Sequence, residues 1–228
     1  MAMSVSKNLR VLKAAVFLLA LIPLANLVAG LFTDGLGANP VETITHATGD
    51  WALRFVLITL AVTPLRELFG WHRLMLLRRM LGLFAFFYAS LHLATWVVFD
   101  HFFDAAGMLE DVLERPYITF GMTAFLLLLP LAATSTDGWI RRLGRRWKQL
   151  HQLVYPAAIV AVLHFVWLVK ADLREPLIYA ALLGLLLGWR LLPLRLRRQL
   201  GRRPRPGSRS GTLGAAAGQI QPNPARTR

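Results

Sequence analysis

Residues 150–169 read LHQLVYPAAIVAVLHFVWLV, and this stretch contains two histidines but no Asp, Glu, Lys or Arg. An α-helix needs about 20 consecutive apolar residues to cross the hydrocarbon core of a bilayer. Ionisable side chains inside such a stretch are rare and usually functional. The stretch therefore predicts a membrane-spanning helix in which His151 and His164 have a role beyond packing.

Further apolar runs of similar length lie on both sides of this one. The predicted spans are Val11–Phe32, Trp51–Phe69, Met80–Asp100, Tyr117–Thr134, Leu150–Val169 and Pro176–Leu192. The first run is longer than the apolar core of a usual signal peptide, which favours a retained helix over a cleaved one. We therefore expect an all-α integral membrane protein, a bundle of six transmembrane helices within a domain of residues 1–193.

The composition agrees with a membrane protein and limits its chemistry. Hydrophobic residues make up 56% of the chain and charged residues only 17%, whereas soluble domains are about 45–50% apolar. The chain has no cysteine, which excludes disulfides, iron–sulfur clusters and thiolate ligation of haem. A redox centre held by this chain would need histidine, methionine or oxygen ligands.

The charges are distributed unevenly among the connections between the spans. The N-terminal tail, the second-to-third connection, the fourth-to-fifth connection and the C-terminal tail together hold 22 of the 26 basic residues. The positive-inside rule then places these four regions, and so both termini, in the cytoplasm. The net charge of +14 is explained by this topology, and we expect no nucleic-acid binding. Residues 194–228 are predicted to form a basic, disordered cytoplasmic tail, which either contacts anionic lipid or only anchors the topology.

The histidines fall into two groups. His46 and His101 in outer connections and His72 in an inner one are expected to be solvated loop residues. His92 and His164 lie in the outer halves of two spans that run in the same direction, so they share one depth. Two imidazoles at one level can supply both axial ligands of a haem. An interhelical hydrogen bond is the alternative. Small residues precede each histidine on its helix, namely Ala85, Ala89, Ala157 and Ala161.

His151 lies thirteen residues before His164, at the cytoplasmic edge of the same span. This is a natural depth for a second haem, but an ideal helix would turn the two side chains about 140° apart. Pro156 between them is expected to change the local twist. The position opposite, fourteen residues before His92, is Arg78. Arg78 or Arg79 is predicted to pair with a haem propionate, to face the iron, or only to mark the cytoplasmic side.

Several motifs carry a family resemblance that covers about residues 9–193. They are Trp51-Ala-Leu-Arg-Phe55, Thr63-Pro-Leu-Arg66, Arg78-Arg-Met-Leu-Gly82, Ser90-Leu-His92, Thr134-Ser-Thr-Asp-Gly-Trp139 and Trp147-Lys-Gln-Leu-His151. In these stretches the chain resembles the ferric-reductase-like transmembrane domain family. Within that family it looks most like the MsrQ-type haem-binding subunits of periplasmic protein-methionine-sulfoxide reductase systems.

The resemblance implies a haem b electron-transfer subunit, with one or two haems, in the bacterial inner membrane. Such a subunit takes electrons from membrane quinones and passes them to an MsrP-like periplasmic molybdopterin-dependent methionine sulfoxide reductase, with which it forms a heterodimer. FMN is also associated with the family. The catalytic site would lie on the partner, and the cofactor-binding residues expected here are His92, His151, His164, Arg78 and Arg79. The stretch 134–139 either serves a quinone or flavin or is only a polar turn.

Two other functions remain open at this stage. A ferric or other metal reductase of the same fold would need an outer metal-binding patch, for which Glu110, Asp111 and Glu114 are candidates. A non-redox transporter or assembly protein would use the histidines to line a polar path. Transporters often show repeated halves, and the sequence shows no obvious internal repeat.

Overall fold

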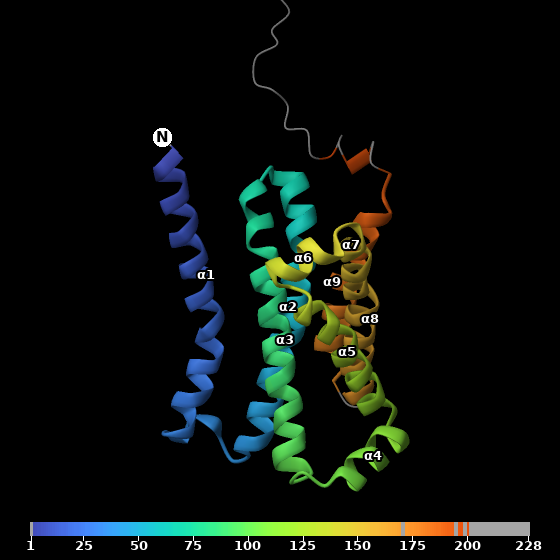
Figure 1. The fold of residues 1–228 in the computed structure, drawn as a ribbon. Coiled ribbons are helices and arrows are strands. Elements are labelled where there is room, and N and C mark those ends of the chain that lie inside the picture. Colours follow the sequence, from blue (N-terminus) through green and yellow to red (C-terminus); the bar gives the residue numbers. More distant parts are fainter. Residues whose placement is uncertain (1, 170–171, 194–195, 198–199, 201–228) are drawn as a thin grey trace, which may run out of the picture.

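The computed structural model describes residues 2–169, 172–193, 196–197 and 200, and all regular elements within them are helical (Figure 1). The long helices are α1 (Ala2–Leu31), α2 (Pro40–Phe69), α3 (Arg78–Thr95), α5 (Pro116–Ala133), α8 (Val154–Leu168) and α9 (Arg174–Leu191). The short α-helices are α4 (Ala105–Glu114), α6 (Asp137–Leu143) and α7 (Arg145–Leu150). The 3₁₀ segments are η1 (Asp34–Leu36), η2 (His72–Leu76) and η4 (His151–Leu153), and η3 (Trp96–Asp100) is a π-helical turn. The predicted tail lies almost entirely outside the described residues.

The long helices lie side by side, and consecutive ones alternate in direction (Figure 1). The most extensive packing is within two antiparallel pairs, α2 with α3 and α5 with α8. α9 packs on α8 and α2, while α1 stands at the edge of the bundle against α2 and α3. The bundle is therefore built around two helix hairpins.

Local sequence signals set the limits of these helices. The Asn39 side chain accepts a hydrogen bond from the Glu42 backbone N–H, and Pro40 occupies the first position of α2, where its missing donor costs nothing. α2 ends at Gly70, which has a φ of 70°, a left-handed conformation that glycine adopts without strain. Pro116 likewise begins α5.

An aromatic cluster fills the contact between α1, α2 and α3. The Phe55 and Tyr88 rings stack with centroids 5.5 Å apart, and Phe17 of α1 meets Phe84 at 5.3 Å. The Tyr88 hydroxyl donates to the Ala20 carbonyl and accepts from the Leu24 backbone N–H. These two groups lie on either side of Pro23, which has no N–H to donate to the Leu19 carbonyl one turn earlier. Tyr88 thus bonds to the backbone of α1 in the turn that contains its proline and anchors this peripheral helix.

Four segments of the described residues are long and apolar enough to cross a membrane, namely Leu9–Leu31, Arg78–Asp100, Pro116–Ala133 and Arg145–Leu168. They correspond to four of the predicted spans. The other long helices, α2 and α9, carry more charge: Asp50, Arg54, Arg66 and Glu67 lie in α2, and Arg174, Glu175 and Arg190 lie in α9. Helices with the length and apolar composition of a membrane span are therefore confirmed at four of the six predicted positions, and six spans stay a prediction.

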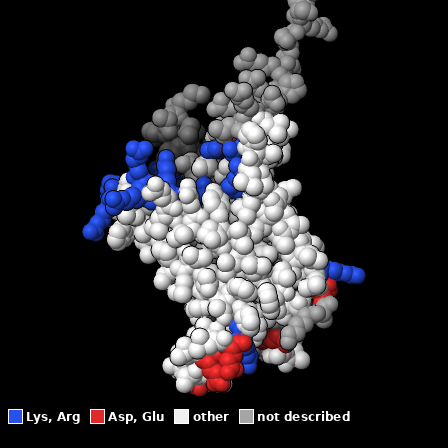
Figure 2. Space-filling view, turned by 90° about the vertical axis from the view of Figure 1, so that its right-hand side faces the viewer, with Lys and Arg blue, Asp and Glu red and all other residues white. Residues whose placement is uncertain are grey.

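The two ends of the bundle differ in charge (Figure 2). Lys and Arg gather at one end, where η2, α6 and α7 connect the helices, and this is called the basic end below. Asp and Glu gather at the opposite end, which contains α4 and is called the acidic end. This separation of basic and acidic residues agrees with the predicted orientation, in which the basic end faces the cytoplasm.

The change of twist expected between His151 and His164 is present, and it lies before Pro156. The 3₁₀ turn of η4 begins at His151, and α8 begins at Val154, two residues before the proline. Pro156 has no backbone N–H to donate to the carbonyl of residue 152, so one α-helical hydrogen bond is missing in this turn. The twist therefore comes from a 3₁₀ turn that the proline favours.

Candidate functional site

His92 and His164 meet inside the bundle at the acidic end. His92 lies near the end of α3 and His164 near the end of α8. Their ring centroids are 6.1 Å apart, with the ring planes at 74°. The two histidines belong to different hairpins, so the packing of the hairpins brings them together. This confirms the equal depth expected from the sequence.

Each of these rings is held by a backbone carbonyl of the neighbouring helix. His92 Nδ1 lies 2.9 Å from the Thr45 carbonyl oxygen, and His164 Nδ1 lies 2.6 Å from the Tyr117 carbonyl oxygen. A carbonyl can only accept, so Nδ1 carries the hydrogen in both rings and Nε2 keeps its lone pair. A histidine that binds a metal through one ring nitrogen is usually oriented in this way, by a hydrogen bond from its other ring nitrogen to a carbonyl or carboxylate.

The distance between the rings fits coordination of one iron from both sides. A metal–imidazole bond is about 2.0–2.1 Å long, and a ring nitrogen lies about 1.15 Å from the centre of a ring with bonds of about 1.35 Å. Two imidazoles on opposite sides of one metal therefore have centres about 6.3–6.5 Å apart. The observed 6.1 Å agrees with this separation. The pair can hold a haem iron with no open coordination site.

Two further features of the site fit a haem. The Thr45 hydroxyl is buried and has no hydrogen-bond partner among the described residues. A bound group with carboxylates, such as the haem propionates, would supply an acceptor. α3 and α8 also approach each other less closely than each approaches its own hairpin partner, and Ala85 and Ala157 are buried on them. Two of the four small residues noted in the sequence are thus buried on the helices that carry the histidines.

Each histidine lies against a glycine of the helix that supplies its carbonyl. A Cβ on Gly49 would lie 3.0 Å from His92 Cε1, and a Cβ on Gly121 would lie 2.9 Å from His164 Nδ1. Each glycine is four residues after the carbonyl residue, Thr45 or Tyr117, so it lies one turn further along the same helix face. The missing side chains let both rings rest on the helix backbone.

These contacts form the same arrangement twice, once in each hairpin. In both cases the carbonyl residue precedes the histidine by 47 residues. Sequence reasoning missed Thr45, Gly49, Tyr117 and Gly121 and found no internal repeat. The sequence did contain one signal, because Gly49 and Gly121 lie at the same distance before His92 and His164. A single matching residue type is a weak signal, and it is recognised only once these two histidines are known to form a pair.

His151 lies at the basic end, away from the other two. Its Nδ1 is 3.1 Å from the Trp147 carbonyl oxygen, and its ring stacks on the Trp147 indole at 3.8 Å. Its Nε2 is 3.5 Å from the Ser135 hydroxyl oxygen, which is too long for a strong hydrogen bond. The Nδ1 contact again leaves Nε2 available as a ligand, but no second histidine faces it in the described residues.

The two candidate arginines lie in different surroundings. Arg78 is half-buried, faces the Tyr155 hydroxyl and acts electrostatically on His151. Arg79 is exposed and forms an ion pair with Asp137 at the start of α6. This pair holds the pKa of the Asp137 carboxyl below its usual range. The structure therefore brings Arg78 to His151 and directs Arg79 to the surface.

The remaining histidines form no site with these. His46 is exposed but lies on α2 and not in a loop, because α2 begins at Pro40, before the predicted span. His72 is exposed on η2. His101 Nε2 lies 3.0 Å from Asp111, which also pairs with Arg115 at 3.0 Å. In the part of the chain that the structure describes, no group of three or more His, Asp or Glu is placed to hold a metal ion.

Comparison with known proteins defines the class that this fold and histidine pair represent. Residues 48–162 match the family model of the ferric reductase like transmembrane component. The match begins beside Gly49 and ends within α8, so it covers most of both hairpins and includes His92 but stops two residues before His164. No solved structure matches the chain.

Curated relatives narrow the class to one family. The chain is 57% identical over 175 residues to the protein-methionine-sulfoxide reductase heme-binding subunit MsrQ of Xanthomonas euvesicatoria pv. vesicatoria (76% of this chain, 80% of the relative). It is 53% identical over 193 residues to MsrQ of Rhodospirillum rubrum (84% and 93%) and 52% identical over 188 residues to MsrQ of Azospira oryzae (82% and 81%). The chain belongs to the MsrQ family of heme-binding membrane subunits.

Proposed function

We propose that this protein is a haem b electron-transfer subunit that carries electrons from membrane quinones to a periplasmic methionine sulfoxide reductase subunit. The pairing of His92 and His164 is the observation that supports this most directly. Their tautomers and their spacing suit bis-imidazole ligation of a haem. Bound haem would supply one-electron redox chemistry, and the chain orients the two ligands and excludes water from them.

The proposed topology has six spans, with both ends of the chain in the cytoplasm of a bacterium and the protein in its inner membrane. The alternating helices and the opposite charges of the two ends support it (Figures 1 and 2). In this orientation His92 and His164 lie near the periplasmic surface. A haem held by them is well placed to reduce a partner docked on the acidic end.

The partner and the electron donor follow from the family. The relatives are named as subunits of a protein-methionine-sulfoxide reductase. We infer a heterodimer with an MsrP-like molybdopterin subunit that carries the catalytic site and repairs methionine sulfoxide. The quinone pool is the proposed donor, and FMN is a further proposed cofactor without assigned residues. His151, with Arg78 beside it, is the proposed ligand set of a second haem at the basic end.

The test is the reduced-minus-oxidised optical spectrum of the protein purified in detergent with haem supplied. Sharp b-type α and Soret bands are expected. His92→Ala and His164→Ala should each abolish the component from the acidic end, whereas His72→Ala, at an exposed position, should leave the spectrum unchanged. Full haem content in both variants would contradict the ligand assignment, and a featureless spectrum of folded wild-type protein would contradict electron transfer itself.

The metal-reductase alternative receives no support from the acidic end. Among its candidate residues, Asp111 is engaged by His101 and Arg115, and Glu110 and Glu114 do not join it in a metal-binding group within the described residues. The position of these acidic residues is explained by the proposed topology, which keeps the basic connections on the cytoplasmic side.

A further inference from the structure

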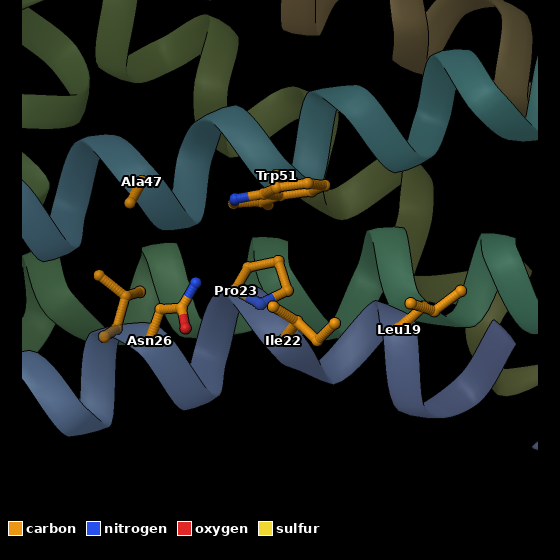
Figure 3. Close-up of a pocket in the computed structure, with 7 residues that line it drawn as sticks. Leu19, Ile22, Pro23, Asn26, Ala47 and Trp51 are labelled. Carbon is orange, nitrogen blue, oxygen red and sulfur yellow. The ribbon is translucent and has the colours of Figure 1, made fainter. Parts of the chain in front are cut away.

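A cavity of about 370 Å³ lies between α1 and α2, apart from the histidines. It is lined by Leu19, Ile22, Pro23, Asn26, Leu27, Ala47 and Trp51 (Figure 3). Its volume lies within the range of about 300–1,000 Å³ typical of small-molecule sites. Both helices contribute residues, and α1 packs only at the edge of the bundle (Figure 1). The cavity is therefore accessible from the lipid.

Two polar groups face this otherwise apolar cavity. The Asn26 amide nitrogen is directed from α1 towards α2, and the Trp51 indole nitrogen lies at the end of its ring nearer Ala47 (Figure 3). Neither group forms a hydrogen bond with another described residue. Asn26 is exposed and Trp51 is half-buried, so both groups can reach an occupant of the cavity. The pair therefore favours an occupant that is apolar overall and carries hydrogen-bonding oxygens.

The cavity lies at the same level as His92, on the other side of α2. Ala47 and Trp51 are two residues before and after Gly49, the residue against which His92 rests. Two residues correspond to about 3 Å along a helix and to a rotation of about 200°. An occupant and His92 are thus separated by little more than the width of one helix, about 10–12 Å.

We propose that this cavity binds the ring of a membrane quinone, in its oxidised or reduced form. A quinone ring is flat and apolar and has two oxygens on opposite edges. The Asn26 amide can donate to a quinone carbonyl or accept from a quinol hydroxyl, and the Trp51 N–H can donate to either oxygen. The Trp51 indole offers a surface for the ring. An acyl chain would fill the same volume but would leave both polar groups unpaired.

This assignment rests on the proposed function and gives the quinone pool a specific site. Oxidation of one quinol to quinone releases two protons and two electrons, and the electrons reduce two ferric haem equivalents one after the other. At this depth the protons would leave towards the acidic end, which the proposed topology places outside. The site is also distinct from the polar stretch 134–139 considered from the sequence.

The test compares haem reduction by a short-chain quinol with reduction by dithionite. Asn26→Leu and Trp51→Phe are expected to raise the quinol concentration for half-maximal haem reduction about fivefold to tenfold, the size expected for one lost hydrogen bond. The dithionite-reduced spectrum should stay unchanged. Ala25→Leu is the matched control, because it adds the same side chain at an exposed neighbouring position that does not line the cavity.

The outcomes separate the site from the function. Wild-type quinol dependence in both cavity variants would overturn the site while leaving the electron-transfer function intact. Absence of quinol-driven reduction in the wild type would instead contradict the quinone pool as donor. As a second measurement, an azidoquinone should label the segments that carry Pro23 or Trp51, and excess unlabelled quinone should prevent the labelling. Labelling confined to other segments would also overturn the site.

Discussion

The two ends of the bundle hold histidines in the same way but with different partners. At the acidic end, His92 and His164 face each other, and each is fixed by a carbonyl from its own hairpin. At the basic end, His151 is fixed by the carbonyl of Trp147, one turn earlier in its own segment. The charge of Arg78 acts on His151, and no second histidine faces it in the described residues. The acidic end is therefore a symmetric site and the basic end an asymmetric one.

This difference shows that each half of the symmetric site is formed by a whole hairpin and not by a single helix. The first helix of each hairpin supplies a carbonyl and a glycine, and the second supplies a histidine. The basic end has no such duplication. There the chain places cations, including Arg190, whose guanidinium donates to the Leu60 carbonyl and lies 5.2 Å from the Tyr155 ring. A haem at the basic end would meet one imidazole and a positive environment suited to propionates.

Removing His151 tests whether the asymmetric site binds a haem of its own. His151→Ala is expected to remove one spectral component completely and to leave the bis-imidazole component at full height, because the two sites share no ligand. The measurement is haem per protein together with the low-temperature α band, and the His164→Ala variant is the counterpart. Identical spectra of His151→Ala and wild type would show that the basic end holds no haem through this residue.

Alanine in place of the hairpin glycines should disturb the symmetric site while keeping its ligands. Gly121→Ala brings a methyl group to 2.9 Å from His164 Nδ1, and Gly49→Ala brings one to 3.0 Å from His92 Cε1. The ring must then rotate or move away from its carbonyl. We expect partial loss of the bis-imidazole haem, with retention weakened about tenfold, the lower end of the effect of disturbing the groups that orient a metal ligand. The remaining haem should give a changed electron paramagnetic resonance signal.

The control for these variants is Gly188→Ala in α9, where an added Cβ meets nothing within 4 Å. Alanine also favours helix by about 1 kcal/mol over glycine, so Gly188→Ala should be neutral or slightly stabilising. If Gly49→Ala and Gly121→Ala behave like Gly188→Ala, the glycines do not position the rings. If only one of them perturbs the spectrum, the two hairpins are less equivalent than their geometry indicates.

The sequence predicted the parts of this arrangement that depend on single residues or on hydropathy. Apolar length gave the transmembrane class, and helix direction gave the common depth of His92 and His164. The carbonyls of Thr45 and Tyr117 could not be predicted, because a backbone acceptor leaves no residue-type signal. The cavity beside Trp51 also depends on how α1 packs, which hydropathy does not determine. His46 was misplaced because α2 continues beyond its apolar part, and helix ends outside a span follow caps such as Asn39.

The ion pair between Arg79 and Asp137 offers the smallest test, because it only fixes the start of α3 next to Arg78. Hydrogen bonding from Arg79 holds the pKa of the Asp137 carboxyl below its usual value of 3.8. A carboxyl whose pKa is lower in the folded state than in the unfolded state stabilises the folded state above the unfolded-state pKa. This stabilisation is lost as the pH falls through the folded-state pKa. Asp137→Asn should therefore lower the Tm slightly at pH 7. The difference should shrink as the pH falls below 3.8 and vanish once the folded-state carboxyl is protonated. Both groups are largely exposed, so the effect should also weaken in high salt.

The same variant tests the spectral component of a haem at the basic end. Glu110→Gln, at the acidic end, is the control and should not alter this component. A shift of that component in Asp137→Asn, without loss of haem, would show that the surface pair positions Arg78 and makes the asymmetric site depend on α6.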